Sequence, residues 1–356
     1  MTIWRTATWN DNFVNHEWLQ KLWYDPNPGP LMRLASLPLW PLHGLFIALT
    51  GTRRWLYRHG WLASQRLSVP VLVIGNIVVG GVGKSPLTIA AARYLIKQGC
   101  RVGILLRGYK GKKSRDGVLV DRASHVADVG DEALMIAHAV PEALVMVDAD
   151  RVRGGQRLVK RGAQVVICDD GLQHYALQRD MEWCVFDARR GIGNGWRLPL
   201  GPLREPLARL DNVSAVLINR TGAPMAILDW LSRVPDDKRF DFVLSPVRVR
   251  RQSTGETAPV DVLAGKRVDA VAGIGDPKRF FATLTALGAQ VRPHPRADHE
   301  RHPFRGLPKD ADFIVCTAKD AVKWTRGDPD IYVLEVEAQL PDQLLTQLDQ
   351  LAGVRV

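Results

Sequence analysis

A glycine-rich loop at residues 73–88, V-I-G-N-I-V-V-G-G-V-G-K-S-P-L-T, has the residue types that bind nucleotide phosphates. An apolar run that predicts a buried strand precedes it, and Gly83-Lys84-Ser85 opens a segment of helical character. Lys84 would reach the β- and γ-phosphates, and the Ser85 hydroxyl would hold Mg²⁺. Val78 stands where the P-loop pattern has its first glycine, and glycine-rich turns also occur in loops that bind nothing. The flanking elements favour a nucleotide site formed by Gly80, Gly81, Val82, Gly83, Lys84, Ser85 and Pro86.

Two carboxylates, Asp169 and Asp170, follow the apolar run Val165–Cys168. An acid at the end of a buried strand beside a P-loop holds Mg²⁺ directly or through water. Many strands end in aspartate, so the pattern indicates a metal site only because a P-loop precedes it in the chain. We expect both residues at a metal site.

Asp131 and Glu132 open a helix-like segment, Ala133–Ala139. Acids at this position commonly cap a helix N-terminus. Alternatively, one carboxylate accepts a proton from an attacking hydroxyl while its neighbour Glu132 serves the metal. The spacing alone leaves both interpretations open.

Basic residues follow another predicted strand, in the run Arg107-Gly-Tyr109-Lys-Gly-Lys-Lys113. Charge runs are usually solvated loops, but a position at the carboxyl end of a strand favours contact with an anion. The stretch from Arg151 to Arg161 is similar and could equally be an exposed helix face. Further along, His299 lies in a loop with His294 and His302. Their irregular spacing without a cysteine fits zinc poorly, so one imidazole acting as a proton carrier is the better functional interpretation beside plain loop histidines.

Composition predicts an intracellular enzyme with an anionic partner. The chain has 356 residues, enough for two domains, and a formal net charge of +11. Its cysteines (Cys100, Cys168, Cys184 and Cys316) show no metal spacing and indicate a reducing compartment. An acidic lipid or membrane surface fits the charge better than nucleic acid, because no nucleic-acid-binding motif is present.

Short apolar runs alternate with helix-like segments from residue 69 to about residue 243, which predicts βαβ units and a parallel sheet covered on both faces. The expected strands are Val71–Ile74, Val102–Leu106, Leu144–Val147, Val165–Cys168, Trp183–Phe186 and Ala215–Ile218. Ligands of such sheets lie at the carboxyl ends of the strands, so the polar residues there should share one site.

A second, smaller α/β unit is expected beyond the strand–turn linker Val247–Pro259. Its elements are strands at Val268–Val271, Phe313–Cys316 and Ile331–Leu334 and a helix at Arg279–Leu287. The predicted organisation is an N-terminal segment 1–68, a P-loop core 69–245, a linker 246–260 and a C-terminal domain 261–356.

The stretch Leu34–Thr52 has no charged residue and is flanked by arginines. It is not a cleavable signal peptide, and prolines dilute it as a membrane-spanning helix. Its leucine, tryptophan and phenylalanine content with arginines beyond favours a helix that lies in the membrane interface. The alternative is a helix packed on the protein core.

Several motifs together resemble the tetraacyldisaccharide 4′-kinase family of lipid A biosynthesis. The most specific are D-D-G-L-Q-H at residues 169–174 and R-L-P-L-G-P-L-R-E at residues 197–205. The resemblance runs from about Pro30 to the C-terminus, and Ala318 departs from it where glutamate is expected. It implies a P-loop NTPase-type α/β fold and an enzyme that uses ATP and Mg²⁺ to phosphorylate the 4′-hydroxyl of an anionic acylated disaccharide. It also implies association with the cytoplasmic face of the inner membrane, with no nucleic acid and no obligate protein partner.

By this resemblance, Asp131 is the general base and His299 pairs with it from the C-terminal domain. Asp170 and Glu132 would support the metal held by Ser85 and Asp169. Contacts to substrate or phosphates are expected from Arg107, Tyr109, Arg151, His174 and Arg204. Two rival functions remain. One is a P-loop GTPase or metallochaperone-like switch, for which T-A-K-D at residues 317–320 approximates a guanine-reading motif. The other is a non-catalytic membrane adaptor, which the retained Lys84 argues against.

Overall fold

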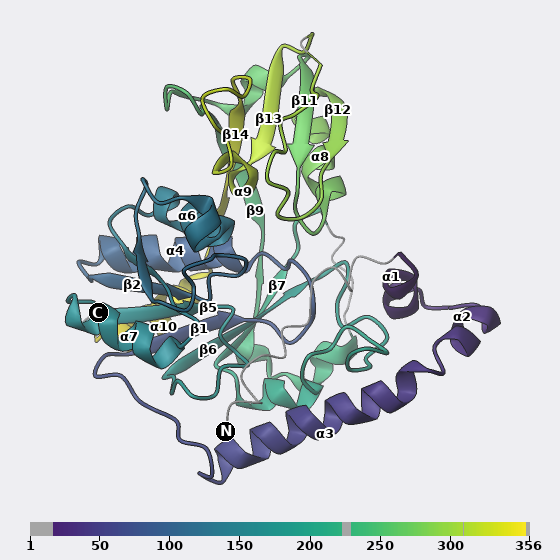
Figure 1. Ribbon diagram of the computed structural model, residues 1–356, viewed down its shortest axis with the longest axis vertical. Helices are drawn as coiled ribbons and strands as arrows, with labels where there is room; N and C mark the ends of the chain where they lie inside the picture. Colours follow the sequence, from purple (N-terminus) through teal and green to yellow (C-terminus); the bar gives the residue numbers. More distant parts are fainter. Residues whose placement is uncertain (1–16, 223–228, 309, 354–356) are drawn as a thin grey trace.

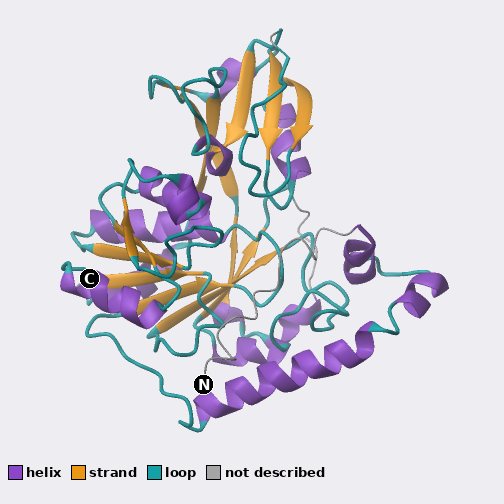
Figure 2. Cartoon of the chain, viewed as in Figure 1, coloured by secondary structure: helices purple, strands orange, loops and turns teal. Residues whose placement is uncertain are grey.

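The computed structural model describes residues 17–222, 229–308 and 310–353, which form a larger and a smaller α/β domain and an N-terminal helical segment. Figure 1 shows the smaller domain above the larger one and helix α3 along the opposite edge. Figure 2 shows the strands of the two domains as two separate sheets. The residues that join the two domains come from helix starts and from loops at strand ends.

The larger domain is built on an eight-stranded sheet in the order β3-β4-β2-β5-β1-β6-β7-β8. Neighbouring strands are parallel except for the β3–β4 pair at one edge, so the predicted parallel sheet and fold class are confirmed. In the centre, Ile74 of β1 pairs with Asp169 of β5, which brings the P-loop and the strand-end carboxylates together. The strands are β1 (Val71–Gly75), β2 (Val102–Leu106), β3 (Val118–Val120), β4 (Leu144–Val147), β5 (Val165–Asp169), β6 (Met181–Asp187), β7 (Ala215–Asn219) and β8 (Arg239–Phe242).

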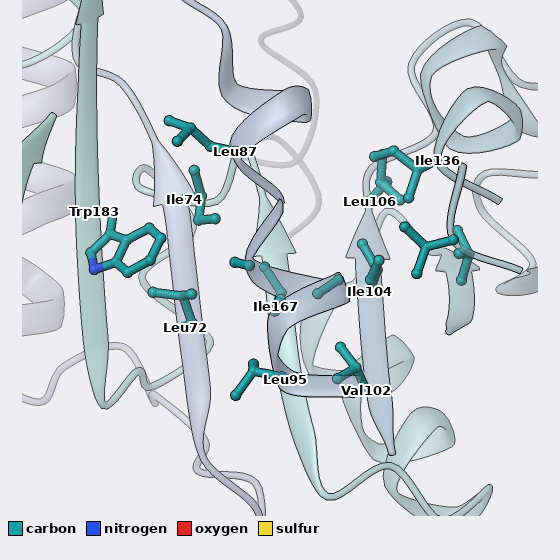
Figure 3. Close-up of a cluster of buried hydrophobic side chains, with 14 of the residues drawn as sticks. Leu72, Ile74, Leu87, Leu95, Val102, Ile104, Leu106, Ile136, Ile167 and Trp183 are labelled. Carbon is teal, nitrogen blue, oxygen red and sulfur yellow. The ribbon is translucent and has the colours of Figure 1, made fainter. Parts of the chain in front are cut away.

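Both faces of this sheet are covered, which explains why its strands read as continuous apolar runs. Leu72 and Ile74 of β1 pack on one face with α4, α6 and α10, in the cluster that Figure 3 shows. Val71 and Val73 face the other side, with α7. The helices are α4 (Lys84–Lys97), α5 (Val126–Val129), α6 (Asp131–Ala139), α7 (Arg151–Lys160) and α10 (Asp342–Ala352), with 3₁₀ turns at Leu207–Asn212, Asp229–Arg233 and Asp236–Lys238.

The smaller domain has a six-stranded sheet in the order β10-β9-β14-β13-β11-β12. Its β9–β14 pair is antiparallel and long, and after β14 the chain returns to the larger domain, where α10 contacts α4. The predicted domain boundaries stay predictions. The elements are β9 (Leu244–Arg251), β10 (Thr257–Ala258), a 3₁₀ turn (Val260–Leu263), β11 (Arg267–Ala272), α8 (Pro277–Ala286), β12 (Gln290–Pro295), β13 (Phe313–Thr317), α9 (Ala318–Ala321) and β14 (Tyr332–Ala338).

The N-terminal segment consists of α1 (Glu17–Tyr24), α2 (Pro30–Ala35) and α3 (Leu39–Arg58). Helix α1 buries Leu19, Leu22 and Trp23 in a small cluster that includes Phe46 of α3. The Trp23 indole N–H donates a hydrogen bond to the Pro199 carbonyl at 2.9 Å. The described part of the predicted N-terminal extension is thus packed on the protein body, while residues 1–16 lie outside the described residues.

Helices α2 and α3 and the turn between them expose large apolar side chains, and α3 also buries two residues against the body. His43 and Phe46 of α3 are buried, and the exposed residues include Leu31, Leu34, Leu37, Trp40, Leu42, Leu45, Leu49 and Trp55. None of the helices in the described ranges combines the length and hydropathy required to cross a membrane.

Candidate active site

The loop between β1 and α4 has the backbone shape that phosphate binding requires. Gly83 has φ of 94° and Gly80 has φ of 115°, which non-glycine residues rarely adopt. A Cβ on Gly83 would also lie 2.8 Å from the Asn219 amide nitrogen. Lys84 is the first residue of α4, and its ammonium lies 3.3 Å from the Asn76 side-chain oxygen and 3.4 Å from an Asp170 carboxylate oxygen. The helix N-terminus and Lys84 therefore present positive charge at one point.

Asp169, at the end of β5, has the features of a magnesium ligand. Its Oδ2 accepts a 3.4 Å hydrogen bond from the Ser85 hydroxyl, whereas its Oδ1 is buried without a hydrogen-bond partner among the described residues. Burial raises the pKa of Asp169 to about 7, with the nearby carboxylates of Glu132 and Asp170 acting in the same direction. A cation at this carboxylate would neutralise it, so the residues fit Mg²⁺ held by Asp169, Ser85, phosphate and water.

Asp170 is placed differently from Asp169, although the sequence assigns both to the metal. Its carboxylate lies 3.4 Å from Lys84 and 3.4 Å from Arg204. Although desolvation opposes the effect, the positive charges of Lys84, Arg204 and Arg151 hold the pKa of Asp170 well below its usual range. In this arrangement Asp170 orients the positively charged side chains of Lys84 and Arg204.

Basic side chains surround the end of β5. Arg151, at the start of α7, is buried and donates a 3.0 Å hydrogen bond to the Asp169 carbonyl, while its Nη1 has no partner among the described residues. Burial lowers the pKa of Arg107, and the charge of Arg151 adds to that effect. Burial and the charge of Arg151 likewise lower the pKa of His174 to about 3. Both shifts arise mainly from burial, with the like charge of Arg151 adding to it, because burial and a nearby positive charge both disfavour a second cation.

Asp131 and His299 meet between the two domains, as the resemblance implied. The His299 Nδ1 lies 2.8 Å and 3.0 Å from the two carboxylate oxygens of Asp131, and the Tyr109 ring lies 5.4 Å from the imidazole. Asp131 is the first residue of α6, so its backbone position is the helix start that the capping interpretation expected. Its side chain, however, reaches across to the smaller domain.

Two lysines of the smaller domain complete this contact, and the sequence did not reveal their role. Lys323 lies 3.5 Å from Asp131, and Lys319 lies 3.4 Å from Glu132 and 2.9 Å from Asp298. Burial alone raises the pKa of Asp131, but the hydrogen bond from His299 and these lysine charges lower it to about 2. Glu132, assigned to the metal by the sequence, therefore forms an ion pair with Lys319. The signal was their spacing after β13: Lys319 lies in α9, which follows the strand directly, and Lys323 lies just after α9.

A second contact joins the domains on the other side of the P-loop, and the sequence did not predict it. Arg279 of α8 pairs with Asp187, the buried last residue of β6, and Arg190 donates a 3.1 Å hydrogen bond to the Gly275 carbonyl. A Cβ on Gly275 would lie 3.4 Å from the Gly81 nitrogen. The loop before α8 thus lies directly on the P-loop. The sequence signal for this second contact was Asp187, which ends β6 in the same way as Asp169 ends β5.

The rival uses of these motifs do not fit the geometry. Asp320 is buried, and its oxygens accept hydrogen bonds from the Gly273 N–H, the Thr317 hydroxyl and Lys323, so it is not free to read a guanine base. His294 contacts Asp269 and not His299. In the described part of the chain, no group of three or more histidine, cysteine or acidic side chains could hold a metal ion.

A phosphate-binding loop in one domain, together with a carboxylate of that domain that pairs with an imidazole of a second domain, is suited to phosphoryl transfer, so the fold and the site define a P-loop kinase. A family model described as tetraacyldisaccharide-1-P 4′-kinase matches residues 35–353. The chain therefore belongs to this family of ATP-dependent kinases.

Curated relatives and a solved structure agree with this assignment. The tetraacyldisaccharide 4′-kinase of Chromobacterium violaceum is 43% identical over 92% of this chain and 95% of its own length. That of Xanthomonas euvesicatoria is 41% identical over 93% of this chain and 96% of its own length. The crystal structure of LpxK from Aquifex aeolicus in complex with ATP is similar with a TM-score of 0.75, at 26% identity over 88% of this chain and 98% of that one.

Proposed function

We propose that the protein transfers the γ-phosphate of ATP to the 4′-hydroxyl of a tetraacyldisaccharide 1-phosphate and gives the 1,4′-bisphosphate. The observation that carries the proposal is the contact of Asp131 with His299 across the domain boundary, beside the P-loop. The names of the most similar relatives supply the acceptor.

Charge neutralisation around ATP is assigned to the P-loop side of the site. The backbone N–H groups of residues 80–83 bind the phosphates, and Lys84 contacts the β- and γ-phosphates. Ser85 and Asp169 hold Mg²⁺, which when bound offsets the charge of the phosphate oxygens. The buried Asp169 oxygen without a partner among the described residues supports this role. Asp170 holds Lys84 and Arg204 in place.

Removal of the proton from the acceptor hydroxyl is assigned to Asp131 and His299 together. A carboxylate with a pKa of about 2 is a weak base on its own. Both of its oxygens also accept hydrogen bonds, from His299 and from the Glu132 N–H. The imidazole orients the carboxylate and shares the proton, so the pair is the proton acceptor.

The acidic substrate is assigned to the basic cluster at the end of β5. Arg107, Arg151 and Arg204 lie around Asp170, with His174 beside them. Phosphate and sugar hydroxyls would supply the acceptors that these donors need. Tyr109, against the His299 ring, is placed to contact the sugar near the reacting hydroxyl.

The ion pairs on both sides of the P-loop would form when the domains close. On one side His299 meets Asp131, and on the other Arg279 meets Asp187. Closure brings His299 of the smaller domain to Asp131, so the proton acceptor is complete only in the closed form, which limits hydrolysis of ATP in the absence of acceptor.

Membrane association at the cytoplasmic face of the inner membrane is assigned to α2 and α3. The exposed leucines and tryptophans would enter the interface, and Arg33 and Arg58 would meet anionic lipid headgroups. An acceptor with four acyl chains would then remain in the bilayer during the reaction.

The test is transfer of radiolabelled γ-phosphate to a purified disaccharide 1-phosphate in detergent micelles, with ATP and GTP compared. Labelled lipid product with ATP and little with GTP supports the proposal. Hydrolysis of GTP without labelling of the lipid would instead support the switch-protein function.

A further inference from the structure

Helix α3 is bonded directly to the loop of residues 170–177, which follows β5 and contains Asp170 and His174. Arg53 of α3 donates a 3.0 Å hydrogen bond to the Gln173 carbonyl. Its guanidinium also lies over the Tyr175 ring, 5.7 Å from the centroid. A side chain of the exposed helix therefore holds a loop of the active site.

The chain that leaves α3 reinforces this attachment. The Gln65 N–H donates to the Ala176 carbonyl at 2.8 Å, and the Ser64 hydroxyl donates to the Tyr175 carbonyl at 2.8 Å. Three carbonyls of the loop, those of Gln173, Tyr175 and Ala176, are thus bound by α3 and the residues that follow it.

The loop is also bonded to the larger domain. Gln173 donates to the Asn76 carbonyl at 2.9 Å and to Glu205 at 3.0 Å. Arg179 donates to the His174 carbonyl at 2.7 Å. Because both the larger domain and α3 hold the loop, a shift of α3 relative to the domain would act on the backbone on both sides of His174.

Arg53 lies on α3 where the exposed leucines Leu45 and Leu49 give way to the contact with the protein body. Leu45, Leu49 and Arg53 follow one another at intervals of four residues and so share one side of the helix. Leu45 and Leu49 are 55% and 40% exposed, whereas Arg53 is half-buried against the loop. Any lipid surface that contacts the leucines lies next to the helix turn that carries Arg53.

Arg53 also acts on the site through its charge. Together with burial and the charge of Arg151, it lowers the pKa of His174. The guanidinium is therefore close enough to influence the group that is expected to contact substrate.

We propose that Arg53 is a positioning residue, which couples the seating of α3 on a lipid surface to the placement of the loop 170–177. The inference rests on the proposed membrane contact of α3. Lipid contact fixes α3 relative to the larger domain, and Arg53 transmits that constraint to the loop. The loop 170–177 is then fully ordered only when the enzyme is bound to the membrane that holds its lipid acceptor.

The test compares hydrogen exchange of the full chain with and without saturating vesicles of phosphatidylethanolamine and phosphatidylglycerol. In the wild type, vesicles should slow amide exchange in residues 170–178 by about fivefold, because local opening becomes less frequent. Arg53→Met should lose this protection while binding the vesicles. Lys97→Met removes an exposed cation from α4, outside the proposed membrane contact, and is the matched control, which should keep the protection. Equal protection of the loop in Arg53→Met and wild type would overturn the proposal.

Kinetics with the lipid acceptor provide a second readout. Arg53→Met should lower kcat about 10-fold with less than a twofold change in the acceptor KM, because misplacement affects the reacting geometry more than binding. Arg53→Lys retains the charge but not the planar stacking, so it should recover part of the rate. A raised KM with unchanged kcat would assign Arg53 to lipid binding alone and contradict the coupling. Since hydrogen exchange requires no turnover, a failure of the proposed kinase reaction would leave that measurement valid.

Discussion

The contact between Asp131 and His299 makes a quantitative prediction about the proton acceptor. We consider Asp131→Ala, His299→Ala and the double variant. In the wild type the two side chains are 2.8 Å apart, and both are largely buried between the domains. If they act as one unit, either substitution removes the whole unit.

The magnitude follows from the pKa of Asp131. Its value of about 2, against an ordinary 3.8, corresponds to about 2.4 kcal/mol of stabilisation of the ionised form. Because the folded-state pKa is depressed, this stabilisation is complete above about pH 4 and is lost as the pH falls through about 2. In His299→Ala, burial remains while the main hydrogen bond is gone, so the pKa of Asp131 rises. The acid limb of the pH dependence of kcat/KM should therefore move to higher pH.

The assay is the rate of lipid phosphorylation across pH 4–9 for the four proteins. The wild-type acid limb set by Asp131 lies below this range, so the shift in His299→Ala is detected as an acid limb that enters it. Each single variant should lose about 10²–10⁴-fold in kcat. The double variant should lose about the same amount, because effects within one unit do not multiply. Thermal unfolding of each variant checks that the fold is intact. Two single losses that multiply in the double variant, or a His299→Ala profile with no acid limb within pH 4–9, would refute the reasoning.

Three further variants test the rest of the site. Lys84→Ala should lower kcat by about 10³-fold or more through loss of charge at the transferred phosphate, and wild-type turnover in a folded variant would contradict the P-loop assignment. Arg279→Ala removes the ion pair with Asp187 and should lower kcat/KM about 10-fold by weakening domain closure, without moving the acid limb of the pH profile; a rate within twofold of wild type would argue against that role. Leu45→Asp should weaken binding to vesicles in flotation assays by about 10-fold or more, since a charge replaces an apolar side chain of the interface, and unchanged flotation would count against membrane contact through α3.

The central strands could be predicted because parallel strands covered on both faces are apolar throughout. The strands β3, β8 and β12 were not predicted, and each lies at an edge of its sheet. Edge strands tolerate polar residues and proline, as in Gln290–Pro295, so they lack the apolar signal. The linker predicted at Val247–Pro259 contains the β9–β10 hairpin.

The candidate site was predictable where it depends on local sequence. Lys84 and Ser85 open α4, Asp169 ends β5, and the three come together because α4 packs against β5 in this fold. The pairing of Asp131 with His299 came from the family resemblance, since 168 residues separate them. The Arg279–Asp187 and Arg53–Gln173 contacts depend on how separate elements pack, and no spacing in the sequence encodes that.

The most direct test of the central claim is the position of the new phosphate on the lipid product. Proton–phosphorus correlation NMR of the product formed from ATP and a tetraacyldisaccharide 1-phosphate should show one additional monoester coupled to the proton at the 4′ carbon. The Asp131→Ala, His299→Ala double variant should give little of this product in the same time. A phosphate at any other hydroxyl, or none despite consumption of ATP, would contradict the account.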